Sequence, residues 1–446
     1  MPPDSQTWDL DILGQQPLLG IYTQICLCFP IEDSEASHSA IIDVLKNALA
    51  RLTASFPWVA GQVVRRDAGV FRIEPYEETP RLVIRDLRKD ATIPSMDALR
   101  RANFPFRMLD ESIIAPRNTI PTPDEASLPS PVLVLQANLI TEGLVLAIVA
   151  QHQTMDMTGQ GQIIHLLSKA CRDEGFTSEE LSVGNLDRHE LVPLLDESYR
   201  PGPEISRSIV QPPPSYPEAP PPPPHSTWLY FSFPHASLAA LKSKATETLP
   251  SGFISTDDTL SAFVWQSIAR ARLHRLKPTD EVTFGRAVDV RQALGIPKTY
   301  PGLMQNMVYH TTTLHELLEM PLGVLASQFR SILDPKALAH NTRALTTFLD
   351  RSLDKSTVSF AATLDLAKDF MLSSWAKIDS CELDFGFGLG KPESVRRPQF
   401  IPVESLGYLM PKTLDGEIAL AVCVRDEDME GLKTDKEFKK YGQCIQ

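Results

Sequence analysis

The amino-acid sequence predicts an α/β protein with two domains of similar size. Its 446 residues are more than one hydrophobic core usually organises. Strand-like and helix-like patterns alternate in both halves of the chain, which is typical of α/β domains. A proline-rich stretch separates the halves, and proline donates no N–H to a helix or a sheet. We therefore predict domains at residues 1–200 and 226–446, an extended crossover at 201–225, and a ligand site between the domains.

The spacing of apolar side chains predicts the individual elements of each half. In the first half we expect a helix over residues 40–55, a strand from residue 71, and a hairpin of the runs 132–140 and 144–150. In the second half we expect a strand at 229–233, a helix at 238–246, a helix capped by Thr256-Asp257-Asp258, a hairpin over 406–424 that turns at Asp415-Gly416, and a charged helix at 426–440.

The composition narrows the classes of partner and cofactor. A formal net charge of −13 argues against nucleic acid or an anionic membrane, since both need a basic surface, but allows a small anionic ligand beside a local basic patch. The six cysteines are scattered, so we expect reduced thiols and no metal site. Residues 1–10 lack a signal-peptide pattern, and no apolar run reaches about 18 residues. We expect a cytoplasmic monomer that acts on small molecules.

One turn is a candidate for chemistry. The apolar run 144–150 leads to His152, and Asp156 follows four residues later. Only His152 among the ten histidines has this spacing, but about half a match is expected by chance. The alternative is structural: a histidine satisfied by the turn, followed by a helix that Asp156 or Thr158 caps.

An imidazole at a strand end has the right acidity for general-base chemistry. With a pKa near 6.5, His152 can take a proton from a hydroxyl that attacks an activated acyl donor. Asp156 either orients the ring or turns away and braces the loop, and the spacing leaves both roles open.

A second motif begins a loop with glycine at alternate positions. It reads Asp384-Phe385-Gly386-Phe387-Gly388 and continues to Gly390 and Lys391, which predicts a tight turn. Pro392 stands where a phosphate-binding loop needs Ser or Thr, and the upstream kinase motifs are missing. Neither a P-loop enzyme nor a kinase is supported.

Together, in this order and at this distance, the two motifs resemble those of the BAHD acyltransferases. That family carries HxxxD near the middle of the chain and DFGWG near the end, and Phe387 here replaces the Trp. The chain is also similar over nearly its full length to the fungal trichothecene 3-O-acetyltransferases. Supporting segments include residues 57–62, 300–303 and 389–398.

The resemblance implies a fold and a division of roles. It implies two chloramphenicol-acetyltransferase-like α/β domains with an active-site channel between them. His152 would deprotonate the acceptor hydroxyl, without a covalent enzyme intermediate and without a metal. Asp156 would point away from His152 and pair with Arg291. Asp384, Gly386 and Gly388 would form a structural loop remote from the chemistry.

The resemblance also implies residues around the acyl group and coenzyme A. Ser373 is a candidate donor to the developing oxyanion and Trp375 a candidate pocket wall, with ordinary strand packing as the alternative. Lys391, Arg396 and Arg397 are candidates for the phosphates of coenzyme A, with solvated surface charge as the alternative for each.

We therefore expect an O-acetyltransferase that uses acetyl-CoA as co-substrate and acetylates a hydroxyl, of the C3-OH type, on a trichothecene or related fungal terpenoid. Three alternatives stay open: a different fungal secondary metabolite as acceptor, a carrier-protein thioester as donor, and a non-catalytic terpenoid-binding protein. The second is disfavoured because Gln151 stands where a doubled histidine would be.

Overall fold

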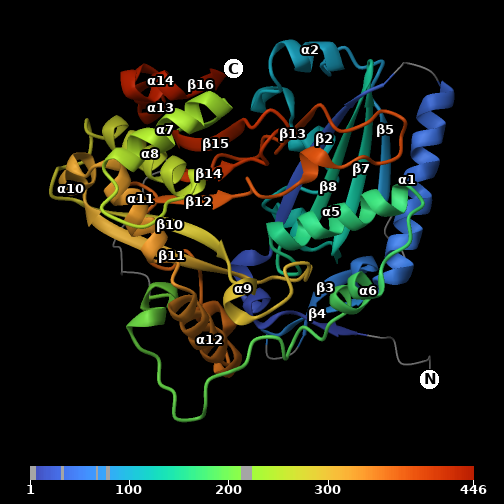
Figure 1. The fold of residues 1–446 in the computed structure, drawn as a ribbon. Coiled ribbons are helices and arrows are strands. Elements are labelled where there is room, and N and C mark those ends of the chain that lie inside the picture. The colour runs from blue at the N-terminus through green and yellow to red at the C-terminus, as the bar shows by residue number, and fades with distance from the viewer. Residues whose placement is uncertain (1–6, 32–34, 67–68, 77–80, 212–223) are drawn as a thin grey trace.

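The computed structural model describes residues 7–31, 35–66, 69–76, 81–211 and 224–446. Within these residues the strands form three sheets, of five, seven and four strands, and helices pack against them (Figure 1). The five-stranded sheet lies on the right of Figure 1 and the seven-stranded sheet on the left. The predicted α/β class is confirmed.

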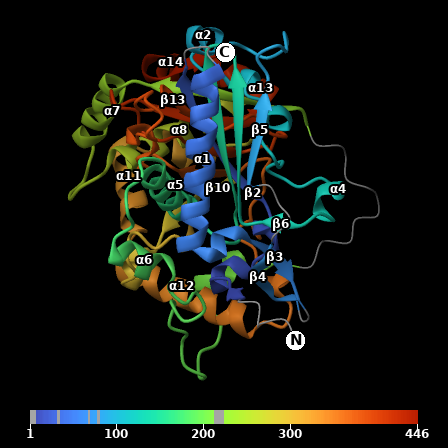
Figure 2. The ribbon, with the colours of Figure 1, turned by 90° about the vertical axis from the view of Figure 1, so that its right-hand side faces the viewer.

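The five-stranded sheet holds the strand that leads to His152. Its strand order is β13 (Ser394–Arg396), β2 (Tyr22–Pro30), β8 (Gly143–Gln151), β7 (Leu133–Ile140) and β5 (Leu82–Asp86). Strands β7 and β8 form the predicted hairpin. Helices α1 (Glu35–Ser55) and α5 (Met157–Cys171) cover one face (Figure 2), and residues around α2 (Met96–Arg101) cover the other. Every residue of β8 is buried, so the turn that follows it is firmly placed.

The seven-stranded sheet is built from the second half of the chain. Its order is β11 (Gln305–Thr313), β10 (Glu281–Asp289), β12 (Phe370–Ser374), β14 (Leu406–Leu409), β15 (Ile418–Arg425), β9 (Ser226–Phe233) and β16 (Gln443–Ile445). The helices that share its core are α7 (His235–Glu247), α8 (Thr256–Ala271), α10 (Leu314–Glu319), α11 (Leu322–Ser331), α13 (Asp426–Thr434) and α14 (Lys436–Tyr441).

Smaller elements complete the fold. The four-stranded sheet has the order β1 (Trp8–Asp9), β4 (Phe71–Pro75), β3 (Gly61–Arg65) and β6 (Ser130–Pro131). The remaining helices are α3 (Glu111–Ile114), α4 (Pro123–Ala126), α6 (Ser178–Gly184), α9 (Arg291–Leu294) and α12 (Pro335–Arg351).

The second half of the chain contributes one strand to the sheet of the first half. Strand β13 belongs to the second half in sequence but pairs antiparallel with β2 of the first. In the loop before it, Phe385 and Phe387 pack edge-on against Phe29 of β2, with ring centroids 5.8 and 5.6 Å apart. The loop that starts at Asp384 therefore fastens the second half of the chain to the first half's sheet.

Two details of the predicted elements are wrong. The charged helix expected at 426–440 is two helices, α13 and α14, because the side chain of Asp435 accepts the N–H of Phe438 (2.9 Å) and so caps a new helix. The N-cap of helix α8 is Ser255, one residue before the predicted segment 256–258; its hydroxyl accepts the N–H of Asp258, and of the predicted residues Asp258 completes the capping box by accepting the Ser255 N–H (2.9 Å).

Three further expectations concern the chain as a whole. Residues 212–223 of the proline-rich crossover lie outside the described residues. All six cysteines are free thiols, and five of them are buried. Among the residues that the structure describes, no helix is both long and apolar enough to cross a membrane.

Candidate active site

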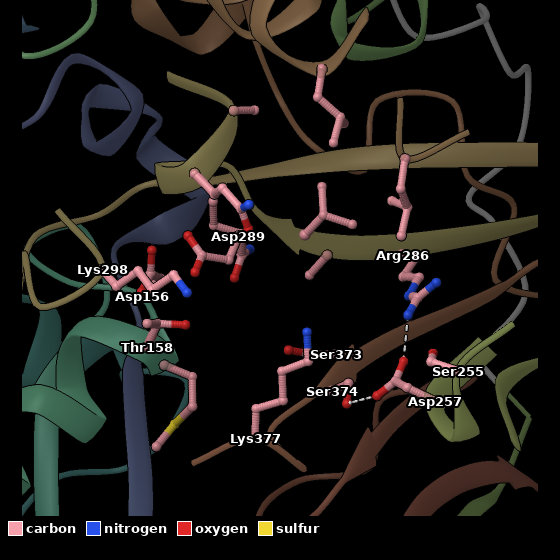
Figure 3. Close-up of a pocket in the computed structure, with 18 of the residues that line it drawn as sticks. Asp156, Thr158, Ser255, Asp257, Arg286, Asp289, Lys298, Ser373, Ser374 and Lys377 are labelled. Carbon is pink, nitrogen blue, oxygen red and sulfur yellow. Dashed lines mark hydrogen bonds and ion pairs between the residues drawn. The ribbon is translucent and has the colours of Figure 1, made fainter. Parts of the chain in front are cut away.

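A cavity of about 550 Å³ lies where the two halves of the chain meet (Figure 3). The first half contributes Asp156, Met157 and Thr158, at the start of α5. The second half contributes the other lining residues, from strands β10, β11 and β12, helices α8, α9, α11 and α12, and the adjoining loops. In Figure 3, Asp156 and Thr158 face Ser373 and Lys377 across the opening.

His152 is the first residue after β8, in the turn between this strand and α5. Its backbone N–H donates to the Ile21 carbonyl (2.8 Å), which continues the pairing of β8 with β2. Its Nδ1 lies 3.0 Å from the Met155 carbonyl oxygen. Since a carbonyl only accepts hydrogen bonds, Nδ1 carries the proton and the lone pair of the neutral ring is at Nε2. The turn thus leaves Nε2 available as a base.

The electrostatic surroundings favour a neutral imidazole. Burial lowers the pKa of His152 below the usual histidine value, and the charge of Arg397 lowers it further. The Met155 carbonyl and the Asp156 carboxylate oppose this shift. Because the pKa is below about 6.5, the ring is mostly neutral at pH 7 and able to accept a proton.

Asp156 is fully occupied by partners other than His152. Its carboxylate caps α5 by accepting the N–H of Gly159 (2.8 Å) and also accepts the N–H of Met304 (2.7 Å). Arg291 adds a bidentate ion pair, with N–O distances of 2.9 and 3.0 Å. The contact with Arg291 that the family resemblance implied is therefore present.

Arg291 uses all five of its side-chain N–H groups. Besides Asp156, it donates to the carbonyls of Tyr300 (2.9 Å) and Gly302 (2.6 Å) and to the carboxylate of Asp289 (2.9 Å). Burial disfavours its charge, but Asp156 and Asp289 outweigh burial and raise the pKa of Arg291. A fully buried guanidinium thus joins the start of α5 to the segment 300–304.

Backbone contact at the same place requires a glycine. A Cβ atom on Gly159 would come within 2.3 Å of the Pro301 carbonyl oxygen and 2.7 Å of that of Gly302. The first turn of α5 and the segment 300–304 are therefore packed too closely for any side chain at position 159.

A second buried ion pair, which the sequence did not reveal, supports the same turn. Arg188 donates to Asp11 (3.0 Å) and to the Thr154 carbonyl (2.8 Å), and Asp11 accepts the Tyr300 hydroxyl (2.5 Å). Burial raises the pKa of Asp11, whereas Arg188 lowers it. The partners are 177 residues apart in sequence, so no local pattern could have identified the pair.

Ser373 and Trp375 are joined by a hydrogen bond beside the cavity. Ser373, on β12, lines the cavity, and its hydroxyl oxygen accepts the indole N–H of Trp375 (3.1 Å). The Ser373 O–H is consequently left to donate elsewhere. Trp375 is buried and packs on Tyr408, with ring centroids 4.9 Å apart.

The residues expected to contact coenzyme A phosphates do not line this cavity. Arg396 and Arg397 are only 3% and 2% exposed, so solvated surface charge, the alternative for both, is wrong. Lys391 is exposed, as that alternative states, and also lies outside the cavity lining. Asp384 accepts the N–H of Gly386 (2.8 Å) in a turn, and neither residue lines the cavity.

Other cations line the cavity instead. Arg286 and Arg330 are paired with Asp258 (2.9 and 2.8 Å). Lys298 and Lys377 are exposed, and no ion pair joins either to another residue that the structure describes. They follow α9 and β12 in segments with no recognisable motif, so only the fold brings these two free ammonium groups to one opening.

Comparisons with known proteins agree with this architecture. Residues 21–171 match the model of the trichothecene 3-O-acetyltransferase-like N-terminal domain. The O-acetyltransferase dmxR13 of a Cryptosporiopsis species is 58% identical over 98% of this chain and 97% of its own length. Trichothecene 3-O-acetyltransferase TRI101 of Fusarium sporotrichioides is 51% identical over 99% and 98%.

Among solved structures, F. graminearum TRI101 complexed with coenzyme A and deoxynivalenol matches with a TM-score of 0.95 and 46% identity. The match covers 99% of this chain and 100% of that one. These similarities extend over nearly the whole chain, which includes both motifs. The chain therefore belongs to the trichothecene 3-O-acetyltransferase family, within the BAHD acyltransferases.

Proposed function

We propose that this protein transfers an acetyl group from acetyl-CoA to a hydroxyl, of the C3-OH type, on a trichothecene or related fungal terpenoid. The observation that carries the proposal is the His152 turn: Nδ1 is fixed on a carbonyl and Nε2 is left as a base. A relative named trichothecene 3-O-acetyltransferase matches 99% of the chain, and one named O-acetyltransferase matches 98%. A cytoplasmic monomer without nucleic-acid or membrane partners belongs to the same proposal, supported by the net charge of −13.

In the proposed mechanism His152 handles one proton and forms no covalent bond. Nε2 takes the proton of the acceptor hydroxyl as its oxygen attacks the thioester carbonyl. The tetrahedral intermediate then expels the thiolate of coenzyme A, which receives the proton from the imidazolium. The products are the acetyl ester and free coenzyme A, and His152 returns to its neutral form.

Ser373 is proposed as a donor to the oxyanion of that intermediate. Its hydroxyl oxygen accepts the Trp375 indole N–H (3.1 Å), and its O–H donates to no other residue in the part of the chain that the structure describes. A donor that is held in place before the reaction is most effective where charge develops. The position of Ser373 on β12, in the cavity lining, supports this role.

The proposal is tested by measuring free thiol and ester together. We expect release of coenzyme A from acetyl-CoA that depends on a trichothecene with a free C3 hydroxyl, and a mass increase of one acetyl group on the acceptor. Turnover only with a carrier-protein thioester would favour the second donor class. Acceptor binding without thiol release under any acyl-CoA would favour a binding protein and contradict the proposal.

Lys298 and Lys377 of the cavity are proposed to pair with the phosphates of coenzyme A, and this role gives a separate prediction. Replacing Lys298 or Lys377 by alanine should raise the KM for acetyl-CoA roughly threefold to fivefold, since an exposed ion pair contributes up to about 1 kcal/mol. The increase should shrink at high salt, because these side chains are exposed. The matched comparison is Lys391→Ala, which removes an exposed lysine outside the cavity lining. If Lys391→Ala raised the KM for acetyl-CoA more than both cavity variants do, the phosphates would bind at the loop after Gly390 instead.

A further inference from the structure

Arg397 is a buried cation without a carboxylate partner among the described residues. It is 2% exposed, and its Nη2 donates to the Thr119 hydroxyl (3.2 Å). Its Nε makes no hydrogen bond to any residue that the structure describes. Burying a charge in this way is costly unless the surroundings compensate, so the position calls for an explanation.

Aromatic rings supply part of the compensation. The guanidinium carbon lies 4.4 Å from the ring centre of Phe400, 4.6 Å from that of Tyr408 and 5.4 Å from that of Trp375. Trp375 in turn donates its indole N–H to Ser373 in the cavity lining. The side chain of Arg397 is therefore packed against Trp375, which is bonded to the cavity residue Ser373 but is not itself among the lining residues.

Hydrogen bonds connect the same side chain to the His152 turn. The N–H of His152 donates to the carbonyl of Ile21, and the next N–H along that strand, of Tyr22, donates to the Thr119 carbonyl (2.9 Å). The Thr119 hydroxyl then accepts from Arg397. Arg397 is thus linked through Thr119 to the strand beside His152, and it contacts Trp375 directly.

The backbone of Arg397 is fixed independently of its side chain. The Tyr230 hydroxyl accepts the Arg397 N–H (2.8 Å) and donates to the Arg397 carbonyl (2.9 Å). Tyr230 lies on β9 of the seven-stranded sheet. The side chain is therefore held from the second half of the chain while it contacts the first.

We infer that Arg397 is a positioning residue of the transfer site, which supports Trp375 and through it Ser373, and which brings its positive charge to the strand beside His152 through Thr119. This inference rests on the proposed acetyl transfer. Arg397 touches neither the reacting hydroxyl nor the thioester in this arrangement; it acts through His152 and Trp375.

The charge has a definite sign of effect on His152. Around the ring, the carboxylate of Asp156, already paired with Arg291, raises the pKa of His152, and Arg397 lowers it. Glu111, which accepts the Thr119 N–H (2.7 Å), is a further carboxylate near Arg397: burial raises the pKa of Glu111, and the charge of Arg397 opposes that rise. Removing the Arg397 charge should raise the pKa of His152, so activity should be lost at a higher pH as the solution is acidified.

The test is the pH profile of kcat/KM, with thiol release as the assay. In Arg397→Met we expect the acid limb to move up by on the order of half a pH unit, and the ratio of activity at pH 6 to that at pH 8 to fall roughly twofold to threefold. Arg397→Gln keeps a donor for Thr119 and should shift the limb in the same direction if the methionine variant does not fold. Arg397→Lys keeps the charge, so its limb should stay while the plateau of kcat/KM falls, because lysine lacks the planar group that stacks on the rings.

The matched control is Arg396→Met. Arg396 is about as buried, at 3% exposure, and its guanidinium carbon lies 5.3 Å from the ring centre of Tyr230. It is not among the groups that shift the pKa of His152. The acid limb of the Arg396→Met profile should therefore stay at the wild-type pH, whatever the substitution does to stability.

Three results would overturn the inference. They are an unmoved acid limb in the neutral Arg397 variants, an equal shift in Arg396→Met, and a wild-type plateau in Arg397→Lys. Failure of the proposed function looks different, because the wild-type protein itself would then release no thiol from acetyl-CoA with any acceptor.

Discussion

Replacing His152 by alanine should lower kcat/KM for acetyl transfer by roughly 10³-fold or more, since a positioned general base commonly contributes 10²- to 10⁴-fold. The physical reason is the orientation of the ring. The Met155 carbonyl holds Nδ1, so the turn presents one lone pair, at Nε2, and alanine provides none. The measurement is thiol release under saturating acetyl-CoA and acceptor, together with a thermal unfolding curve.

The fold should survive this change, because His152 is half-buried and the side-chain hydrogen bond that it makes within the described residues is to a carbonyl that water can satisfy. A matched control is His165→Ala, in the middle of α5, where the ring is 35% exposed and lies 3.8 Å from Asp379. We expect the control to keep nearly full activity. Retention of more than a tenth of the activity by His152→Ala, in a folded protein, would remove His152 from the mechanism.

Local patterns in the sequence were sufficient to predict the strands and the helix that surround His152. An apolar run with no charge can only be a buried segment, and its hairpin turn and the helix cap at Asp156 each have a short-range chemical cause. The helix 426–440 shows the limit of such patterns. In the sequence Asp435 is one charged residue among several, so the pattern predicts one continuous helix. Only the cap that Asp435 forms in the structure divides it into two.

Contacts between the two halves could not be predicted from spacing alone. Arg291 was reached through family resemblance, but its five donors depend on carbonyls at Tyr300 and Gly302 whose direction only the fold sets. The burial of Arg396 and Arg397 is a similar case. An arginine pair in a polar segment indicates surface charge, and nothing local shows that β13 inserts beside β2.

Replacing Asp156 by asparagine should destabilise the protein by about 3 kcal/mol and lower activity roughly tenfold to a hundredfold. Asparagine keeps one acceptor but loses the charge, and it turns an NH₂ group toward a guanidinium that is 0% exposed. Breaking a buried ion pair typically costs about 3–5 kcal/mol, because the remaining charge is left uncompensated. Activity should fall because the same carboxylate caps α5 and bonds Met304, so the His152 turn loses its support from both sides.

The measurement is thermal unfolding at a fixed scan rate, with kcat recorded at a temperature well below the transition. A double-mutant cycle with Arg291→Met should return a coupling of about 2 kcal/mol, since removing both charges is less harmful than removing one. Additive effects in the cycle would mean that the ion pair does not brace the turn.

The sharpest control is Asp289→Asn, because Asp289 bonds the same Nη1 atom of Arg291 (2.9 Å). Its side chain is 43% exposed, whereas that of Asp156 is 3% exposed. Water can replace most of the hydrogen bonding and charge compensation that Asp289 gives Arg291. The substitution should therefore lower the free energy of unfolding by less than about 1 kcal/mol. Asp289 also makes no bond to α5 among those that the structure describes, so its loss should leave the His152 turn in place. If Asp156→Asn and Asp289→Asn lost the same stability, the site would require only a carboxylate that neutralises Arg291. The specific link from Arg291 through Asp156 to α5 would then not be needed.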